Sequence, residues 1–87
     1  MQASADRTMF SEVASMLREV VGDPGVELTP GTTADDVPAW DSMAHITLIV
    51  EAECRFGVQF QIAEIEDLHN LGELVRAIES KRMRAAA

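Results

Sequence analysis

The chain has 87 residues, the size of one domain with a single modest core. Hydrophobic residues make up 47% of it, but no apolar run approaches the ~18 residues of a membrane span, so we expect no such span. The formal net charge is −8, and up to Ser80 fifteen acidic residues are offset by four basic ones, a balance of −11. Such a surface repels nucleic acid phosphates, which argues against nucleic acid as a partner, and attracts proteins with basic docking patches.

The termini and the single cysteine bear on where the protein works. Residues 1–6 lack the basic start and apolar stretch of a signal peptide, so we expect a cytoplasmic protein. Cys54 is the only cysteine, which excludes an intramolecular disulfide and agrees with a reducing compartment. The initial Met and the short tail favour a free-standing domain over residues 1–87, with a frayed tail over 81–87. We expect a monomer. Excision from a larger protein stays open.

Apolar residues at helical spacing predict a first helix over residues 6–21. Gly22, Pro24 and Gly25 end it. A long connection follows over residues 26–40, and we expect its few apolar side chains to pin it over the core. These side chains are Val26, Leu28 and Val37. A long connection without regular structure is uncommon in a compact domain and is often functional.

A second helix is predicted over residues 43–56, which contain no Gly or Pro. Pro38 disfavours helix at the residue before it, and Asp41 is the expected N-cap. Ser42 therefore lies in the first turn, beside unpaired backbone N–H groups and the positive end of the helix dipole. A phosphorylated or phosphate-linked Ser42 fits that position.

This second helix has too many apolar residues for one stripe. One stripe consists of Leu48, Ile49, Ala52 and Phe56 with His45, and the opposite stripe of Met43, Val50 and Cys54, with Ile46 at the border. Two interpretations follow: either both stripes are buried between flanking helices, or the second is partly exposed and open to partners.

The last third of the chain predicts a connector and two helical segments. Beyond Gly57, the alternation of Val58, Phe60 and Ile62 favours an extended connector, because a lone strand would have no partner. Residues 63–68 predict one or two helical turns, and Asn70 is the expected cap of a last helix, with Glu73 completing a variant capping box. The predicted buried face of that helix is Leu71, Leu74, Val75 and Ile78.

Other chemistry near Ser42 finds little support. Asp41, Ser42 and His45 could suggest a triad, but Asp41 is poorly placed to orient the imidazole, and a Gly-x-Ser-x-Gly turn is absent. A hydrolase is therefore not expected. His45 and His69 have no metal-ligand spacing, and the acids at 35 and 36 lack the pattern of a calcium loop, so we expect no metal.

Asp41-Ser42-Met43 at the head of an amphipathic helix resembles the Asp-Ser-Leu signature of acyl carrier proteins. The resemblance extends to the segment 28–32, Leu-Thr-Pro-Gly-Thr, and to Phe-Gly-Val at 56–58, so it covers nearly the whole chain. The chain departs from the family at Trp40, where most members carry Gly, and mildly at Met43, which replaces Leu. Trp40 is either an anchor of the loop on the core or a partner contact.

The resemblance implies an all-α four-helix bundle with a short third helix and a long loop between helices one and two. It further implies that a phosphopantetheinyl transferase moves 4'-phosphopantetheine from coenzyme A to Ser42, where acyl groups are then held as thioesters. The protein would be a carrier without catalytic activity of its own, in fatty-acid, polyketide or related specialised biosynthesis. Its partners would be the transferase and the acyl-loading and synthase enzymes.

The residues expected to contact these partners lie on or beside the second helix. They are Asp41, Met43, Trp40, Val50, Glu51 and Glu53. Two alternatives remain: a peptidyl or aminoacyl carrier, against which Asp41 before the serine weighs slightly, and an unmodified helical adaptor. The sequence does not predict the pathway or the cargo.

Overall fold

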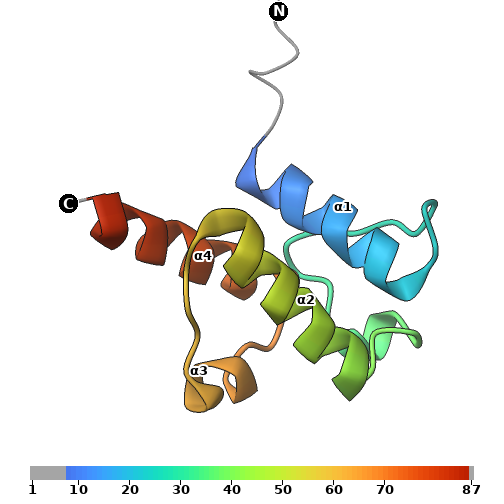
Figure 1. Cartoon of the computed structure of the whole chain (residues 1–87). Coiled ribbons are helices and arrows are strands. Elements are labelled where there is room, and N and C mark those ends of the chain that lie inside the picture. The colour runs from blue at the N-terminus through green and yellow to red at the C-terminus, as the bar shows by residue number, and fades with distance from the viewer. Residues whose placement is uncertain (1–7, 87) are drawn as a thin grey trace, which may run out of the picture.

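The computed structural model describes residues 8–86, which form helices and connections without a strand (Figure 1). The elements are α1 (Met9–Val21), a short 3-10 helix η2 (Ala34–Asp36), α2 (Ser42–Phe56), α3 (Ile62–Glu66) and α4 (Leu71–Ala86). This order confirms the predicted all-α architecture with a short third helix and a long connection before the second. Among these helices none is both long enough and apolar enough to cross a membrane.

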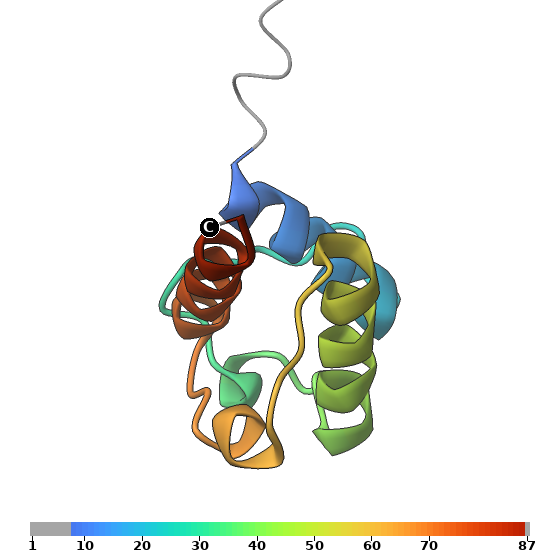
Figure 2. The ribbon, with the colours of Figure 1, turned by 60° about the vertical axis from the view of Figure 1, so that its left-hand side comes forward.

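Figure 2 shows α2 and α4 as the two sides of the bundle, with α1 packed across one end. α1 contacts both α2 and α4, and α2 also contacts α4. α3 and η2 lie toward the other end, where α2 begins. The segment that precedes α2 and the short third helix therefore meet around the start of α2.

Local capping determines where α1 begins and ends. The Thr8 side chain accepts a hydrogen bond from Ser11 N at 3.0 Å, so the helix begins at Met9. The predicted start at residue 6 lies outside the described residues. At the other end Gly22 adopts φ 76°, a left-handed conformation, and its N–H donates to Arg18 O at 2.9 Å.

The core is built from one face of each long helix and from three side chains of the connection. Its most buried members are Val13, Met16 and Leu17 of α1, Leu48, Ile49 and Ala52 of α2, and Leu71, Leu74 and Ile78 of α4. Fully burying a Val, Leu, Ile or Met side chain stabilises a fold by about 1.5–3 kcal/mol. The predicted faces of α2 and α4 are confirmed, although Phe56 and His45 at the edge of the α2 stripe are only half-buried.

The long connection is pinned as predicted and is also tied to α4. Leu28 and Val37 are buried, and Val26 is half-buried. Leu71 N donates to Thr32 O at 2.9 Å, and Gly72 N donates to Pro30 O at 2.7 Å. These carbonyls satisfy N–H groups at the start of α4 that have no partner within the helix. The connection is not wholly irregular, because η2 forms one turn within it.

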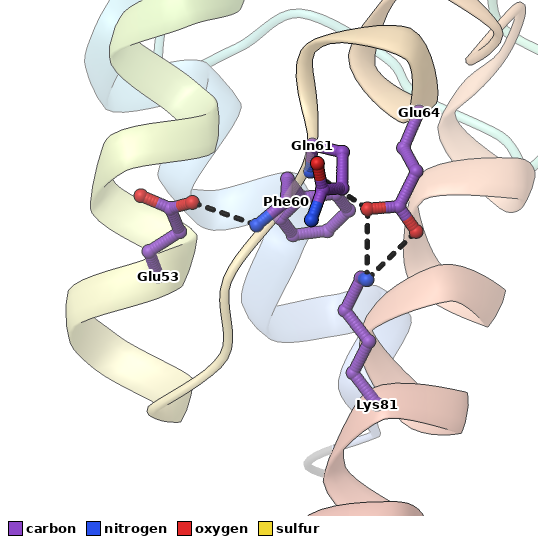
Figure 3. A network of polar contacts seen from close by, with 5 residues as sticks. All are labelled: Glu53, Phe60, Gln61, Glu64 and Lys81. Atoms are coloured by element: carbon purple, nitrogen blue, oxygen red, sulfur yellow. Dashed lines mark hydrogen bonds and ion pairs between the residues drawn. The ribbon is translucent and has the colours of Figure 1, made fainter.

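A polar network joins the end of α2, the connector and α4 to α3 (Figure 3). Glu53 Oε2 accepts from Phe60 N at 2.8 Å, and Glu64 Oε1 accepts from Gln61 N at 2.7 Å. Lys81 Nζ bonds both oxygens of Glu64, at 2.7 and 3.0 Å, and lies 5.0 Å from the centre of the Phe60 ring. The connector is extended, as predicted, and α3 begins one residue earlier than expected, at Ile62.

Asn70 caps the start of α4 as predicted, and the helix continues into the tail that was expected to fray. Asn70 Oδ1 accepts from Glu73 N at 2.8 Å, and Glu73 Oε1 accepts from His69 N at 2.7 Å. This backbone hydrogen bond favours the charged form and lowers the pKa of the Glu73 carboxyl. α4 extends to Ala86, so residues 81–86 of the tail that was predicted to fray over 81–87 are helical, and Lys81 is paired with Glu64. Residue 87 lies outside the described range.

Candidate functional site

Ser42 occupies the first position of α2, and its side chain is exposed. Asp41 is the N-cap, as predicted: its backbone is extended, at φ −92° and ψ −171°, and its Oδ1 accepts from Ala44 N at 2.9 Å. This cap fixes where the helix starts and leaves the Ser42 hydroxyl at the surface. The first-turn N–H groups and the helix dipole make the surroundings of that hydroxyl favourable for a phosphate.

A groove of about 550 Å³ adjoins Ser42 and runs between the start of α2, η2 and α3. It is lined by Ala34, Asp35, Trp40, Asp41, Ser42, His45, Ile46, Ile65, Glu66, Leu68 and His69. The groove thus combines apolar side chains, two imidazoles and three carboxylates. A flexible group attached to Ser42 would have both apolar and polar surface within reach.

Trp40 anchors the connection to the core. Its side chain is buried, with 4% exposed, and its indole Nε1 donates to His45 Nδ1 at 3.2 Å. The two ring centres are 5.9 Å apart and the planes are tilted by 40°. The anchor interpretation is therefore confirmed, and little of the indole is left for a partner to touch.

The same geometry leaves no catalytic triad. The Asp41 carboxylate caps Ala44 N, and the Nδ1 atom of His45 is occupied by Trp40. Asp41 therefore does not orient the imidazole toward Ser42 in the way that a triad requires. Within residues 8–86, no group of three His, Cys, Asp or Glu side chains could hold a metal ion.

The second apolar stripe of α2 is exposed. Met43 is 75%, Ile46 49% and Val50 51% accessible to solvent. Cys54 is exposed as well. Ile62, at the start of α3, is 75% exposed. Its alternation with Val58 and Phe60 predicts an extended connector but not this exposure.

The two acids of α2 differ in their surroundings. Glu51 is exposed, and its Oε2 atom lies 3.6 Å from Nη2 of Arg55 on the next turn. Glu53 is half-buried, and one of its oxygens is bonded to Phe60 N. Glu51 is therefore available at the surface, whereas Glu53 also holds the connector to α2.

Comparison with known proteins agrees with this geometry. The family model described as a phosphopantetheine attachment site matches residues 11–78. An acyl carrier protein of Streptococcus pyogenes serotype M1 is 34% identical over 73 residues, which cover 84% of this chain and 95% of that protein. An acyl carrier protein of Thermotoga maritima is 30% identical over 73 residues, which cover 84% and 90%. The solution structure of holo acyl carrier protein from Geobacter metallireducens superposes with a TM-score of 0.82, at 32% identity and 90% coverage of both chains.

A helical bundle that presents a serine at the exposed start of its second helix, and that matches these relatives, is a carrier domain for a covalently attached 4'-phosphopantetheine group. The chain belongs to the phosphopantetheine attachment family and, within it, to the acyl carrier proteins. Members of this family are carriers that generally have no catalytic activity of their own. They interact with phosphopantetheinyl transferases and synthase enzymes.

Proposed function

We propose that Ser42 is the residue to which 4'-phosphopantetheine is attached, and that the protein carries acyl intermediates for fatty-acid, polyketide or related specialised biosynthesis. The observation that carries this proposal is the exposed Ser42 hydroxyl at the first position of α2, next to a groove of about 550 Å³. The residues present fit the group, since first-turn N–H groups favour a phosphate and the groove offers apolar surface beside it.

The attached group supplies a terminal thiol, on which an acyl chain is held as a reactive thioester. The contribution of the chain is mechanical: Asp41 fixes the start of α2, and Trp40 fixes the segment before it. A covalent tether raises the local concentration of the acyl group at each partner's active site. A carrier of this kind needs no catalytic side chains.

We also propose that partners dock on the outer face of α2, which we define as Asp41, Met43, Val50 and Glu51. All four are exposed, and together they offer apolar area flanked by negative charge. Transferase, acyl-loading and synthase enzymes would meet this face with basic patches. Trp40 and Glu53, also expected at this surface, would act mainly by holding the adjoining backbone in place. The carrier would work in the cytoplasm and as a monomer. The charge of −8 favours the monomer, because it keeps copies apart.

Two alternatives lead to different outcomes in the same assay. A peptidyl or aminoacyl carrier would accept the phosphopantetheinyl group but would be loaded by enzymes that activate amino acids. An unmodified adaptor would accept no group at all. The exposed Ser42, at the start of a helix that Asp41 caps, favours a modified carrier over the adaptor.

The test is intact-mass measurement after incubation with coenzyme A and a broad-specificity phosphopantetheinyl transferase. Wild type gains one phosphopantetheinyl group and Ser42→Ala gains none. Ser11→Ala is the matched control, because Ser11 is an exposed serine in the first turn of α1 and its loss leaves loading complete. Since Asp41 rather than Ser42 is the cap, Ser42→Ala changes stability by no more than about 0.5 kcal/mol. If Ser42→Ala is still modified, the attachment site is a different residue. If wild type is not modified, the adaptor is favoured.

A further inference from the structure

The hydrogen bond between Trp40 and His45 determines which nitrogen of His45 carries the proton. Indole Nε1 is always a donor, and a neutral imidazole has one donor and one acceptor nitrogen. Because His45 Nδ1 accepts from Trp40 Nε1 at 3.2 Å, the proton of the neutral ring is on Nε2. Trp40 thereby makes His45 a donor at its other edge.

That donor lies on the same side of α2 as Ser42. His45 follows Ser42 by three positions, a spacing that places side chains on one helix face, and helical side chains lean toward the helix N-terminus. Both residues line the same groove. Nδ1 and Nε2 flank the Cε1 atom and point in different directions, and Nδ1 is bonded to the buried indole. His45 is half-buried and lines the groove, so its Nε2–H is the ring donor left for a group that lies there.

The charges around the groove give this donor a role. Asp35, Asp41 and Glu66 line the groove, so an anion attached at Ser42 is surrounded by like charges. The first-turn N–H groups offset part of that repulsion, but Ala44 N is already taken by Asp41. A neutral N–H donor one turn further along the helix is a second group that can stabilise a phosphate oxygen.

We propose that His45 is a positioning residue for the group attached at Ser42: its Nε2–H donates to a phosphodiester oxygen, and Trp40 holds the imidazole in the tautomer that allows this. The inference rests on the proposed attachment at Ser42. His45 acts on the orientation of the arm at its root, and no bond is made or broken in the process.

The apo protein tests the tautomer first. Proton–nitrogen correlation spectra of 15N-labelled histidine, at about pH 8.5 where imidazole is neutral, show only the Nε2–H form of His45 in wild type. Trp40→Phe keeps an aromatic ring in the core but removes the donor, so a signal from the Nδ1–H form of His45 grows in. Persistence of the pure Nε2–H form in a folded Trp40→Phe protein would contradict the assigned role of Trp40.

The holo protein tests the contact, with 31P and 15N spectra as readouts. Loading shifts the His45 Nε2 resonance of wild type. His45→Phe has no donor, so the 31P resonance of its phosphodiester moves toward that of the free arm. His45→Gln keeps an N–H donor, so its 31P resonance stays closer to that of wild type. His69→Gln is the matched control, because His69 also lines the groove, and it leaves the 31P resonance unchanged.

Intact mass, recorded on the same samples, distinguishes the attachment at Ser42 from the contact made by His45. Complete loading with identical 31P resonances in wild type and His45→Phe overturns the role of His45 and leaves Ser42 as the attachment site. Failure of wild type to load overturns both. If Trp40→Phe does not fold, the comparison of His45→Phe with His45→Gln still decides the contact.

Discussion

At the scale of single residues, Trp40 shows how one side chain connects the loop, the core and the site. A tryptophan in place of a small residue costs nothing in exposed apolar area here, because its indole is buried and its one polar atom is paired with His45. The sequence alone allowed either an anchor or a partner contact. The burial of the indole favours the anchor. This burial depends on how the helices pack around Trp40, and no local sequence pattern predicts that packing.

Gly72 provides a residue-scale prediction, since it is buried in the first turn of α4 against the long connection. A Cβ atom at this position would lie 2.9 Å from Pro30 O and 3.1 Å from Pro30 Cβ. In an open helix Gly→Ala gains about 1 kcal/mol, but here the connection must move, so we expect Gly72→Ala to cost about 1–3 kcal/mol. The measurement is urea denaturation, with Gly25→Ala as the control, because a Cβ there meets nothing closer than 3.8 Å. A Gly72→Ala protein as stable as wild type would contradict the tight contact.

The residues predicted best from the sequence are those whose role is local. The caps Asp41 and Asn70 and the glycines that end α1 and α2 act on backbone groups a few positions away, so the residue type alone indicates the role. Gly72 was not recognised, because the atoms that exclude a side chain there belong to a residue distant in sequence. The Ser42 position follows from Asp41 for the same local reason.

At the scale of elements, α2 separates what periodicity can predict from what it cannot. Helical spacing defines both of its apolar stripes, but only the packing of α1 and α4 determines which stripe is covered. In the structure Leu48, Ile49 and Ala52 are covered, while Met43 and Val50 remain outside. The outer stripe is exposed apolar area on a strongly acidic protein, an arrangement suited to partners that combine apolar and basic groups.

Two substitutions on α2 test this division. Leu48→Ala leaves a cavity in the core and costs about 2–5 kcal/mol of folding free energy. Val50 is half-exposed, so Val50→Asp changes the stability of the fold by only about 0.5 kcal/mol. The affinity for the transferase falls, because an apolar contact of the docking face is lost. Thermal melting and a binding titration measure the two effects. Ser15→Asp adds the same charge on the exposed side of α1 and leaves affinity unchanged. A Val50→Asp protein that unfolds would mean that the outer stripe supports the core.

The ends of α3 and α4 were predicted less well, and the reason is long-range contact. Glu64 and Lys81 are 17 positions apart, yet their ion pair ties α3 to α4, and Arg82 lies 5.5 Å from the centre of the Phe56 ring. These contacts join the first two residues of the tail, Lys81 and Arg82, to α3 and α2. A short helix such as α3 is marginal in isolation, so its bounds depend on such partners.

At the scale of the whole molecule, the order and type of the helices follow from spacing and capping, whereas their arrangement in space followed only from the resemblance to a known family. The net charge could be read from the sequence, because it depends on composition alone. Fifteen acids on an 87-residue chain produce a negative field that reaches beyond any one contact. This field acts on partners before they touch α2, so it governs the rate of association more than the stability of the complex.

The rate at which the transferase associates with the carrier should therefore fall as salt is added. Between about 0.05 and 0.5 M salt the screening length falls from above 10 Å to about 4 Å, and we expect the association rate constant to drop by ~10-fold while dissociation changes much less. Stopped-flow mixing across a salt series measures both. Glu51→Gln, on the docking face, should flatten the salt dependence, and Glu79→Gln, an exposed acid on α4, should alter it less. If the association rate constant of wild type does not change with salt, the apolar stripe of α2, and not the acidic surface, drives the association of partners near Ser42.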